Sequence, residues 1–93
     1  MQLRLHKGDC NITIFPNPSI NQNSITFTTT NEVEAVKIDM YDIQGRMINK
    51  VYHDKPIVGL NIINNNINML PNGIYIYKIQ IGKNIEHIKF VKQ

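Results

Sequence analysis

The sequence predicts an all-β domain, an immunoglobulin-like antiparallel β-sandwich of about seven strands. Short apolar runs alternate with polar residues at a period of two, and no segment shows the period of a helix. Clusters of Pro, Gly and Asn interrupt these runs at intervals of about 8–12 residues. No long crossover segment separates the runs, so neighbouring strands are expected to be antiparallel.

Length and composition indicate one small domain. The chain has 93 residues, of which 42% are hydrophobic, enough to bury roughly 60–65% of its unfolded surface. Residues 1–11 lack sustained periodicity and are expected to form a linker, which leaves residues 12–93 for the sandwich. Cys10 is the only cysteine, so no disulfide can form within the chain.

Charge and hydropathy argue against two classes of partner. The formal net charge of +3 comes from scattered Lys and Arg residues, without the dense block or motif that accompanies nucleic-acid binding. No apolar run approaches the roughly 18–20 residues that span a bilayer. Residues 1–9 lack the apolar segment of a signal peptide. We therefore expect a chain that neither inserts into a membrane nor starts its own export.

Four strands are expected in the first half of the chain. The first is an edge strand, because Pro16 and Pro18 follow it and remove two backbone donors. Asp42 to Gly45 has the residues of a hairpin turn. The strand after that turn has a mixed pattern, which indicates partial burial. The four ranges are 12–15, 24–30, 35–41 and 46–53, with Ile25, Phe27, Val36, Ile38 and Met40 facing inward.

Three more strands are expected in the second half. In the strand predicted over 58–63, Leu60 and Ile62 are expected to face inward, and Asn64 to Asn66 to end the strand. Gly82 to Asn84 is expected to form a tight turn, since Gly and Asn tolerate positive φ. The other two ranges are 74–81 and 85–92, with Tyr75, Tyr77, Ile79, Ile81, Ile88 and Phe90 facing inward.

A corner precedes the strongest β-forming run. Pro71 fixes φ and lacks an N–H, and Gly73 tolerates positive φ, so the backbone can turn sharply before it extends. Tyr75 follows the corner, and its buried hydroxyl would find a carbonyl in the bend, as in the tyrosine corner of immunoglobulin-like domains. Alternatively, Tyr75 is a large core residue whose hydroxyl reaches the rim. The sequence leaves both possibilities open.

No constellation of catalytic or metal-binding residues is present. His6, His53 and His87 occur in separate segments without ligand spacing, and the serines lack the context of a nucleophile. Asp39 and Asp42 are expected to be solvated and not to form an acid-base pair. We therefore expect no enzyme activity, no cofactor and no metal.

Four short motifs, in order and in register, resemble one protein family. They are Phe15-Pro16-Asn17-Pro18, Tyr41-Asp42-Ile43-Gln44-Gly45-Arg46, Leu70-Pro71-Asn72-Gly73-Ile74-Tyr75 and Lys89-Phe90-Val91-Lys92-Gln93. With these motifs the chain resembles the type A C-terminal sorting domains of the type IX (Por) secretion system, over about residues 11–93.

The resemblance implies a seven-stranded sandwich at the C-terminus of a larger cargo protein in a Gram-negative bacterium. Such domains direct their cargo from the periplasm across the outer membrane through a translocon. A sortase-like cysteine peptidase commonly removes them, and the cargo is then attached to surface lipopolysaccharide or released. Here the cut would fall between Leu3 and Asn11. This implies a secretion signal that is itself not an enzyme.

The resemblance also suggests recognition residues. Most motif residues have a structural explanation, because prolines and glycines form turns while Leu70 and Tyr75 pack. Arg46 and the run Lys89 to Gln93 lack one, so recognition is expected at the last strand and its free carboxylate. The alternative is a carbohydrate-binding or adhesive β-sandwich of a surface protein, with Tyr41 and Tyr52 as aromatic platforms.

Overall fold

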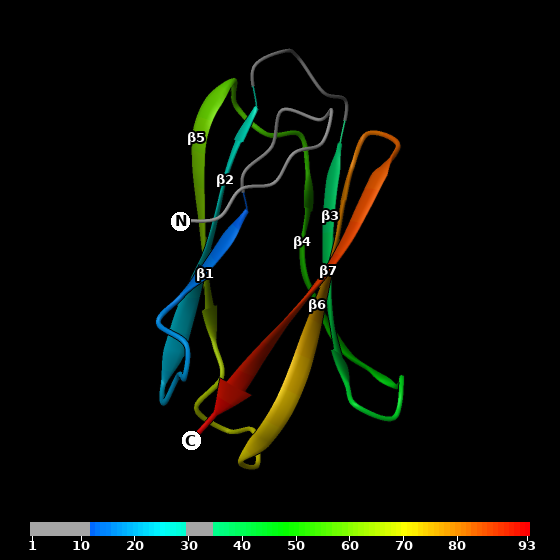
Figure 1. Ribbon diagram of the computed structural model, residues 1–93. Helices are drawn as coiled ribbons and strands as arrows, with labels where there is room; N and C mark the ends of the chain where they lie inside the picture. The colour runs from blue at the N-terminus through cyan, green and yellow to red at the C-terminus, as the bar shows by residue number, and fades with distance from the viewer. Residues whose placement is uncertain (1–11, 30–34) are drawn as a thin grey trace.

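A computed structural model describes residues 12–29 and 35–93, and this part of the chain contains strands and no helix (Figure 1). The predicted all-β class is therefore confirmed. The strands are β1 (Thr13–Phe15), β2 (Gln22–Thr29), β3 (Val36–Asp42), β4 (Met47–Asp54), β5 (Gly59–Asn66), β6 (Gly73–Ile81) and β7 (Asn84–Lys92).

The seven strands form two antiparallel sheets that face each other. One sheet has the strand order β1-β2-β5 and the other has the order β4-β3-β6-β7. β5 returns to pair with β2 after the chain has crossed to the second sheet for β3 and β4, which is a Greek-key connection. The two layers are seen edge-on in Figure 1. This arrangement agrees with the predicted immunoglobulin-like sandwich, and β1 is an edge strand as expected.

Alternate side chains of the facing strands form the core. The inward residues predicted for β2, β3 and β6 are all buried, with at most 6% of their surface exposed. In β7, Phe90 is fully buried and Ile88 packs against the same cluster. The ring of Phe90 stacks on those of Tyr77 and Tyr75, with centroids 4.7 and 5.8 Å apart.

The prediction for β5 was wrong in facing and in length. Leu60 and Ile62 point outward, with 58% and 57% of their surfaces exposed, whereas Asn61 and Asn65 are buried. Buried amides are tolerated here because they are hydrogen-bonded. Asn61 Nδ2 donates to the carbonyl oxygen of Ile57 at 2.9 Å, and Asn65 Nδ2 donates to the hydroxyl of Tyr77 at 2.8 Å. β5 also continues through Asn66 instead of ending at Ile63.

The mixed pattern of β4 has a structural cause. Its pairing with β3 shifts register twice, between Ile38 and Asp39 and between Met40 and Tyr41. Each shift interrupts the alternation of faces, so the consecutive residues Val51 and Tyr52 both pack against the core. The expected partial burial is confirmed.

The corner before β6 is a tyrosine corner. Gly73 is the first residue of β6 and has a φ of 155°. The Tyr75 hydroxyl donates a hydrogen bond to the carbonyl oxygen of Pro71 at 2.6 Å. This bond decides between the two alternatives that the sequence left open. The β6–β7 turn is slightly tighter than expected, since Asn84 already belongs to β7 and pairs with Ile81.

Candidate recognition site

The four motifs lie at the same end of the sandwich. In the pairing of β3 with β6, Asp42 is opposite Tyr75, and in that of β6 with β7, Gly73 is opposite Lys92. Ser19, next to the first motif, forms an isolated parallel bridge with Lys92. The four segments occupy the lower end of the molecule in Figure 1. Motifs dispersed along the sequence therefore share one surface.

The first motif contacts the fourth through Asn17. Its Oδ1 accepts a hydrogen bond from the backbone N–H of Val91 at 3.0 Å, and its Nδ2 lies 3.5 Å from the carbonyl oxygen of Lys89. Asn17 is flanked by Pro16 and Pro18, and both prolines follow cis peptide bonds. Through its two contacts with β7, the side-chain amide of Asn17 occupies the position that a neighbouring strand would otherwise take.

Ser19 continues this pairing along β7. Its N–H donates to the carbonyl oxygen of Val91, and its carbonyl oxygen accepts from the N–H of Gln93, both at 2.7 Å. Phe90 and Lys92 are buried, with 0% and 7% of their surfaces exposed. The expectation that Lys89 to Gln93 lack a structural role was therefore wrong, because this segment is held on its outer edge and contributes to the core.

A chain of hydrogen bonds ties the first motif to the interior. The Ser19 hydroxyl donates to the carbonyl oxygen of Pro16 and accepts from Asn23 Nδ2, the latter at 3.2 Å. Asn23 Oδ1 accepts from the Tyr77 hydroxyl at 2.6 Å. Burial raises the pKa of Tyr77 to about 12, although the hydrogen bonds from Asn65 and to Asn23 oppose this shift. The chain crosses from one sheet to the other, because Asn23 belongs to β2 and Tyr77 to β6.

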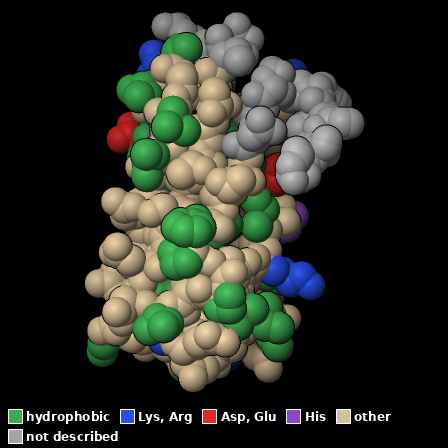
Figure 2. All heavy atoms as spheres, turned by 60° about the vertical axis from the view of Figure 1, so that its left-hand side comes forward, with side chains coloured by type: hydrophobic (Ala, Val, Ile, Leu, Met, Phe, Trp, Pro, Cys, Tyr) green, Lys and Arg blue, Asp and Glu red, His purple; other side chains and the backbone are tan. Residues whose placement is uncertain are grey.

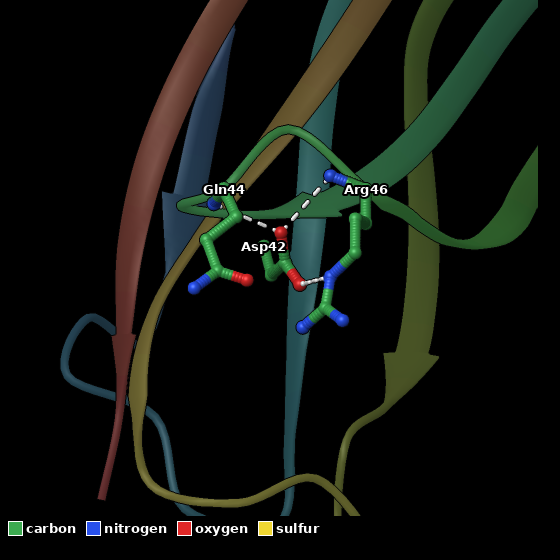
Figure 3. A network of polar contacts seen from close by, with 3 residues as sticks. All are labelled: Asp42, Gln44 and Arg46. Atoms are coloured by element: carbon green, nitrogen blue, oxygen red, sulfur yellow. Dashed lines mark hydrogen bonds and ion pairs between the residues drawn. The ribbon is translucent and has the colours of Figure 1, made fainter.

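The second motif is a turn organised by Asp42 (Figure 3). Its Oδ1 accepts from the backbone N–H groups of Gln44 and Arg46 at 2.9 and 3.0 Å, and its Oδ2 accepts from Arg46 Nε at 2.8 Å. Gly45 supplies the positive φ, 88°, that the turn needs. The backbone N–H of Arg46 is the main cause that lowers the pKa of Asp42, and the guanidinium of Arg46 and the N–H of Gln44 add to it.

Arg46 therefore has a structural role that sequence reasoning missed. Its ion pair with Asp42 positions the side chain, yet 74% of that side chain remains exposed. An Asp four residues before an Arg across a turn was a signal present in the sequence. Arg46 combines a fixed position with an accessible cation.

The turn and the corner enclose a shallow pocket. Its volume is about 260 Å³, and it is lined by residues 42–44 and Arg46 from the turn and by residues 72–75 from the corner. Leu70 is half-buried against the core, and Pro71 is exposed. The second and third motifs thus form two walls of one depression.

Asp39 and Asp42 were expected to be solvated, but only 13% and 14% of their side-chain surfaces are exposed. His53 Nε2 lies 2.7 Å from Asp39 Oδ1, a cross-strand pair that sequence reasoning did not foresee. Asp42 is engaged with Arg46, so the two aspartates do not form a pair. Within residues 12–29 and 35–93, no group of three His, Cys, Asp or Glu side chains could hold a metal ion. His6 and Cys10 lie outside these residues.

The two tyrosines expected as possible sugar platforms are both half-buried. Tyr52 packs partly against the core, and its hydroxyl donates to the carbonyl oxygen of Lys55 at 3.3 Å. Tyr41 lines a groove on the outer face of the four-stranded sheet. In the described part of the chain, no helix is long and apolar enough to cross a membrane.

Comparison with known proteins agrees with the four motifs. A family model described as a secretion system C-terminal sorting domain matches residues 13–93, which include the whole sandwich and every motif. No curated protein matches the chain significantly. The family comprises sorting signals and not enzymes, which implies export of the protein from the bacterial cell. The chain belongs to the secretion system C-terminal sorting domain family and is a sorting signal of the type IX secretion system.

Proposed function

We propose that this domain directs an attached cargo protein from the periplasm across the outer membrane, and that the type IX translocon recognises the end of the sandwich where the four motifs meet. The observation that carries the proposal is this convergence, in which Asp42 lies opposite Tyr75 and Gly73 opposite Lys92. A receptor that binds this end can contact all four motifs at once. A motif that served only local folding would not need to lie beside the other three.

The motif residues divide into two roles. Tyr75 and Phe90 are buried and hold the shape of this end. Arg46, Pro71, Lys89 and Gln93 are exposed and are available for contact. Arg46 is the strongest candidate, because Asp42 fixes the direction of an otherwise flexible cation and so reduces the entropy lost on binding.

We further propose that a sortase-like cysteine peptidase cuts within residues 3–11, which precede β1 and lie outside the described part of the chain. The cleaved cargo would then be attached to surface lipopolysaccharide or released. Cleavage at this place would leave the sandwich intact. The support for this step is the family membership of the chain.

A matched pair of substitutions tests the recognition surface. Arg46→Ala and Lys83→Ala each remove one cation from a turn, but Lys83 lies in the β6–β7 turn at the opposite end of the sandwich. In a reporter fused before the domain, we expect Arg46→Ala to lower export several-fold and Lys83→Ala to leave it unchanged. Equal export of both variants, with equal melting temperatures, would contradict recognition at the motif end.

Point substitutions are preferable to deletion of Lys89 to Gln93. Phe90 belongs to the core, and Val91 and Gln93 pair with Asn17 and Ser19, so the deletion would remove part of the fold. Loss of export by such a deletion would not separate unfolding from lost recognition. Lys89→Ala changes an exposed side chain and avoids this ambiguity.

A further inference from the structure

The outer faces of the two sheets differ in charge. On the three-stranded sheet, the outward positions of β2 and β5 carry no Lys, Arg, Asp or Glu; they are Gln22, Ser24, Thr26, Thr28, Leu60, Ile62, Asn64 and Asn66. Figure 2 shows hydrophobic side chains spread over the β5 side, with Lys, Arg, Asp and Glu side chains only towards the margins of the view. This face offers little to a charged partner.

The outer face of the four-stranded sheet is cationic. Its outward positions include four lysines, Lys37, Lys50, Lys78 and Lys89, and one carboxylate, that of Asp39. The carboxylate of Asp39 is opposite both Lys50 and Lys78 and is paired with His53 at 2.7 Å. Lysines therefore outnumber carboxylates on this face, and His87 lies beside Lys78 on β7.

A groove of about 330 Å³ lies on this cationic face, next to the turn of the second motif. Its lining includes the side chains of Tyr41, Ile43 and Ile76, together with Lys78 and His87. Asp42 also lines the groove, but its carboxylate is neutralised by Arg46. The groove thus offers apolar contact area beside a cation.

We infer that this groove and its lysines bind an acidic segment of a partner protein, which inserts an apolar side chain beside Tyr41 and Ile76 and directs carboxylates toward Lys50 and Lys78. This inference rests on the proposed function, because the partner is then a protein of the export machinery. Charge complementarity favours an acidic partner on this face, and the uncharged opposite face provides the contrast.

The first test places opposite charges at one position. Ile43 lies on the turn, is 66% exposed and lines the groove, so substitutions there should leave the fold intact. With a reporter fused before the full chain, we expect Ile43→Asp to reduce export about three- to tenfold and Ile43→Lys to retain it, because only the aspartate repels acidic groups. Equal export of the two variants would overturn the inference.

The second test compares the two faces at the same change in net charge. Lys50→Gln with Lys78→Gln removes two positive charges from the cationic face, and Leu60→Glu with Ile62→Glu adds two negative charges to the other. We expect only the lysine double variant to lose export, again about three- to tenfold. Loss of export by the glutamate double variant alone would place the partner on the other face and overturn the inference.

Two controls make the outcomes distinguishable. If the unsubstituted domain fails to export the reporter, the proposed function itself fails; if it exports and the lysine double variant exports equally, only the inference fails. Sedimentation of the chain with anionic phospholipid vesicles tests a membrane as the alternative. Binding to these vesicles that is lost with Lys50→Gln and Lys78→Gln would assign the face to lipid and overturn a protein partner.

Discussion

The side-chain amide of Asn17 pairs with the backbone of Val91, 74 residues later in the chain. Together with Ser19 it closes the outer edge of β7 where the strand ends. An unpaired edge strand offers its N–H and C=O groups to other chains, so this pairing protects the end of the sheet. The same contact joins the first motif of the sorting domain to the last.

This contact should contribute to stability. Asn17→Ala leaves the N–H of Val91 without its partner in the protein, and we expect the free energy of unfolding to fall by about 0.5–1.5 kcal/mol. Urea denaturation measures this change, and amide hydrogen exchange at Val91 should become faster. Asn17→Asp keeps the acceptor oxygen, so its free energy of unfolding should fall less than that of Asn17→Ala. Unaltered exchange at Val91 in the alanine variant would show that the contact is unimportant.

The buried hydroxyl of Tyr77 should contribute more to the free energy of unfolding than the hydroxyl of Tyr75. Tyr77→Phe leaves the buried amides of Asn23 and Asn65 without a shared partner, and we expect a loss of about 1–3 kcal/mol in unfolding free energy. Tyr75→Phe removes one hydrogen bond to a part-buried carbonyl, and we expect about 1 kcal/mol. Denaturation of both variants under one condition gives the order, and a larger loss for Tyr75→Phe would contradict the hydrogen-bond chain.

The raised pKa of Tyr77 predicts a specific loss of stability at alkaline pH. Its ordinary value is 10.0 and its value in the folded protein is about 12, so between these two the unfolded chain releases a proton that the folded chain retains. The contribution of Tyr77 is complete below pH 10 and decreases as pH rises toward 12.

Tyr77→Phe is the control for this titration, since the other tyrosines remain. The unfolding free energy of the unsubstituted protein should therefore fall more steeply with pH across this window than that of the variant. If the unfolding free energies of the two proteins fall equally with pH, the pKa of the Tyr77 hydroxyl is not raised in the folded protein.

Gly73 should resist replacement by a branched residue. Its φ of 155° is strained for other residues, although no atom lies within 4 Å of the position of an added Cβ. We expect Gly73→Val to reduce stability by about 1–3 kcal/mol through backbone strain and not through a clash. Thermal unfolding checks this, with Ile74→Val at the next position as a mild comparison. If Gly73→Val has the melting temperature of the unsubstituted protein, the corner does not require glycine at position 73.

Most strands could be predicted because apolar and polar residues alternate within them, as in β2 and β6. β5 could not, because Leu60 and Ile62 are more hydrophobic than Asn61 and Asn65, and local pattern alone favours burying them. The partner that makes the burial of Asn65 possible is Tyr77, on another strand. When the hydrogen-bond partner of a buried polar residue lies far away in the sequence, no local residue pattern predicts the burial.

The candidate site was predictable only in part for the same reason. The motifs and the turn chemistry of Asp42 and Gly45 are visible in the sequence. Their meeting at one end depends on strand register, which places Asp42 opposite Tyr75. Register likewise brings His53 near Asp39, because His53 is opposite Lys37 and Asp39 lies two residues further along β3 on the same face.

We expect the sandwich alone to be sufficient to direct an attached protein for export. The direct measurement is a fluorescent reporter that is delivered to the periplasm with residues 11–93 fused behind it, in a bacterium with the type IX system. We expect fluorescence at the cell surface or in the medium, and its loss in a strain without the translocon. Reporter that stays in the periplasm of the competent strain, or that leaves the cell without the translocon, would contradict the claim.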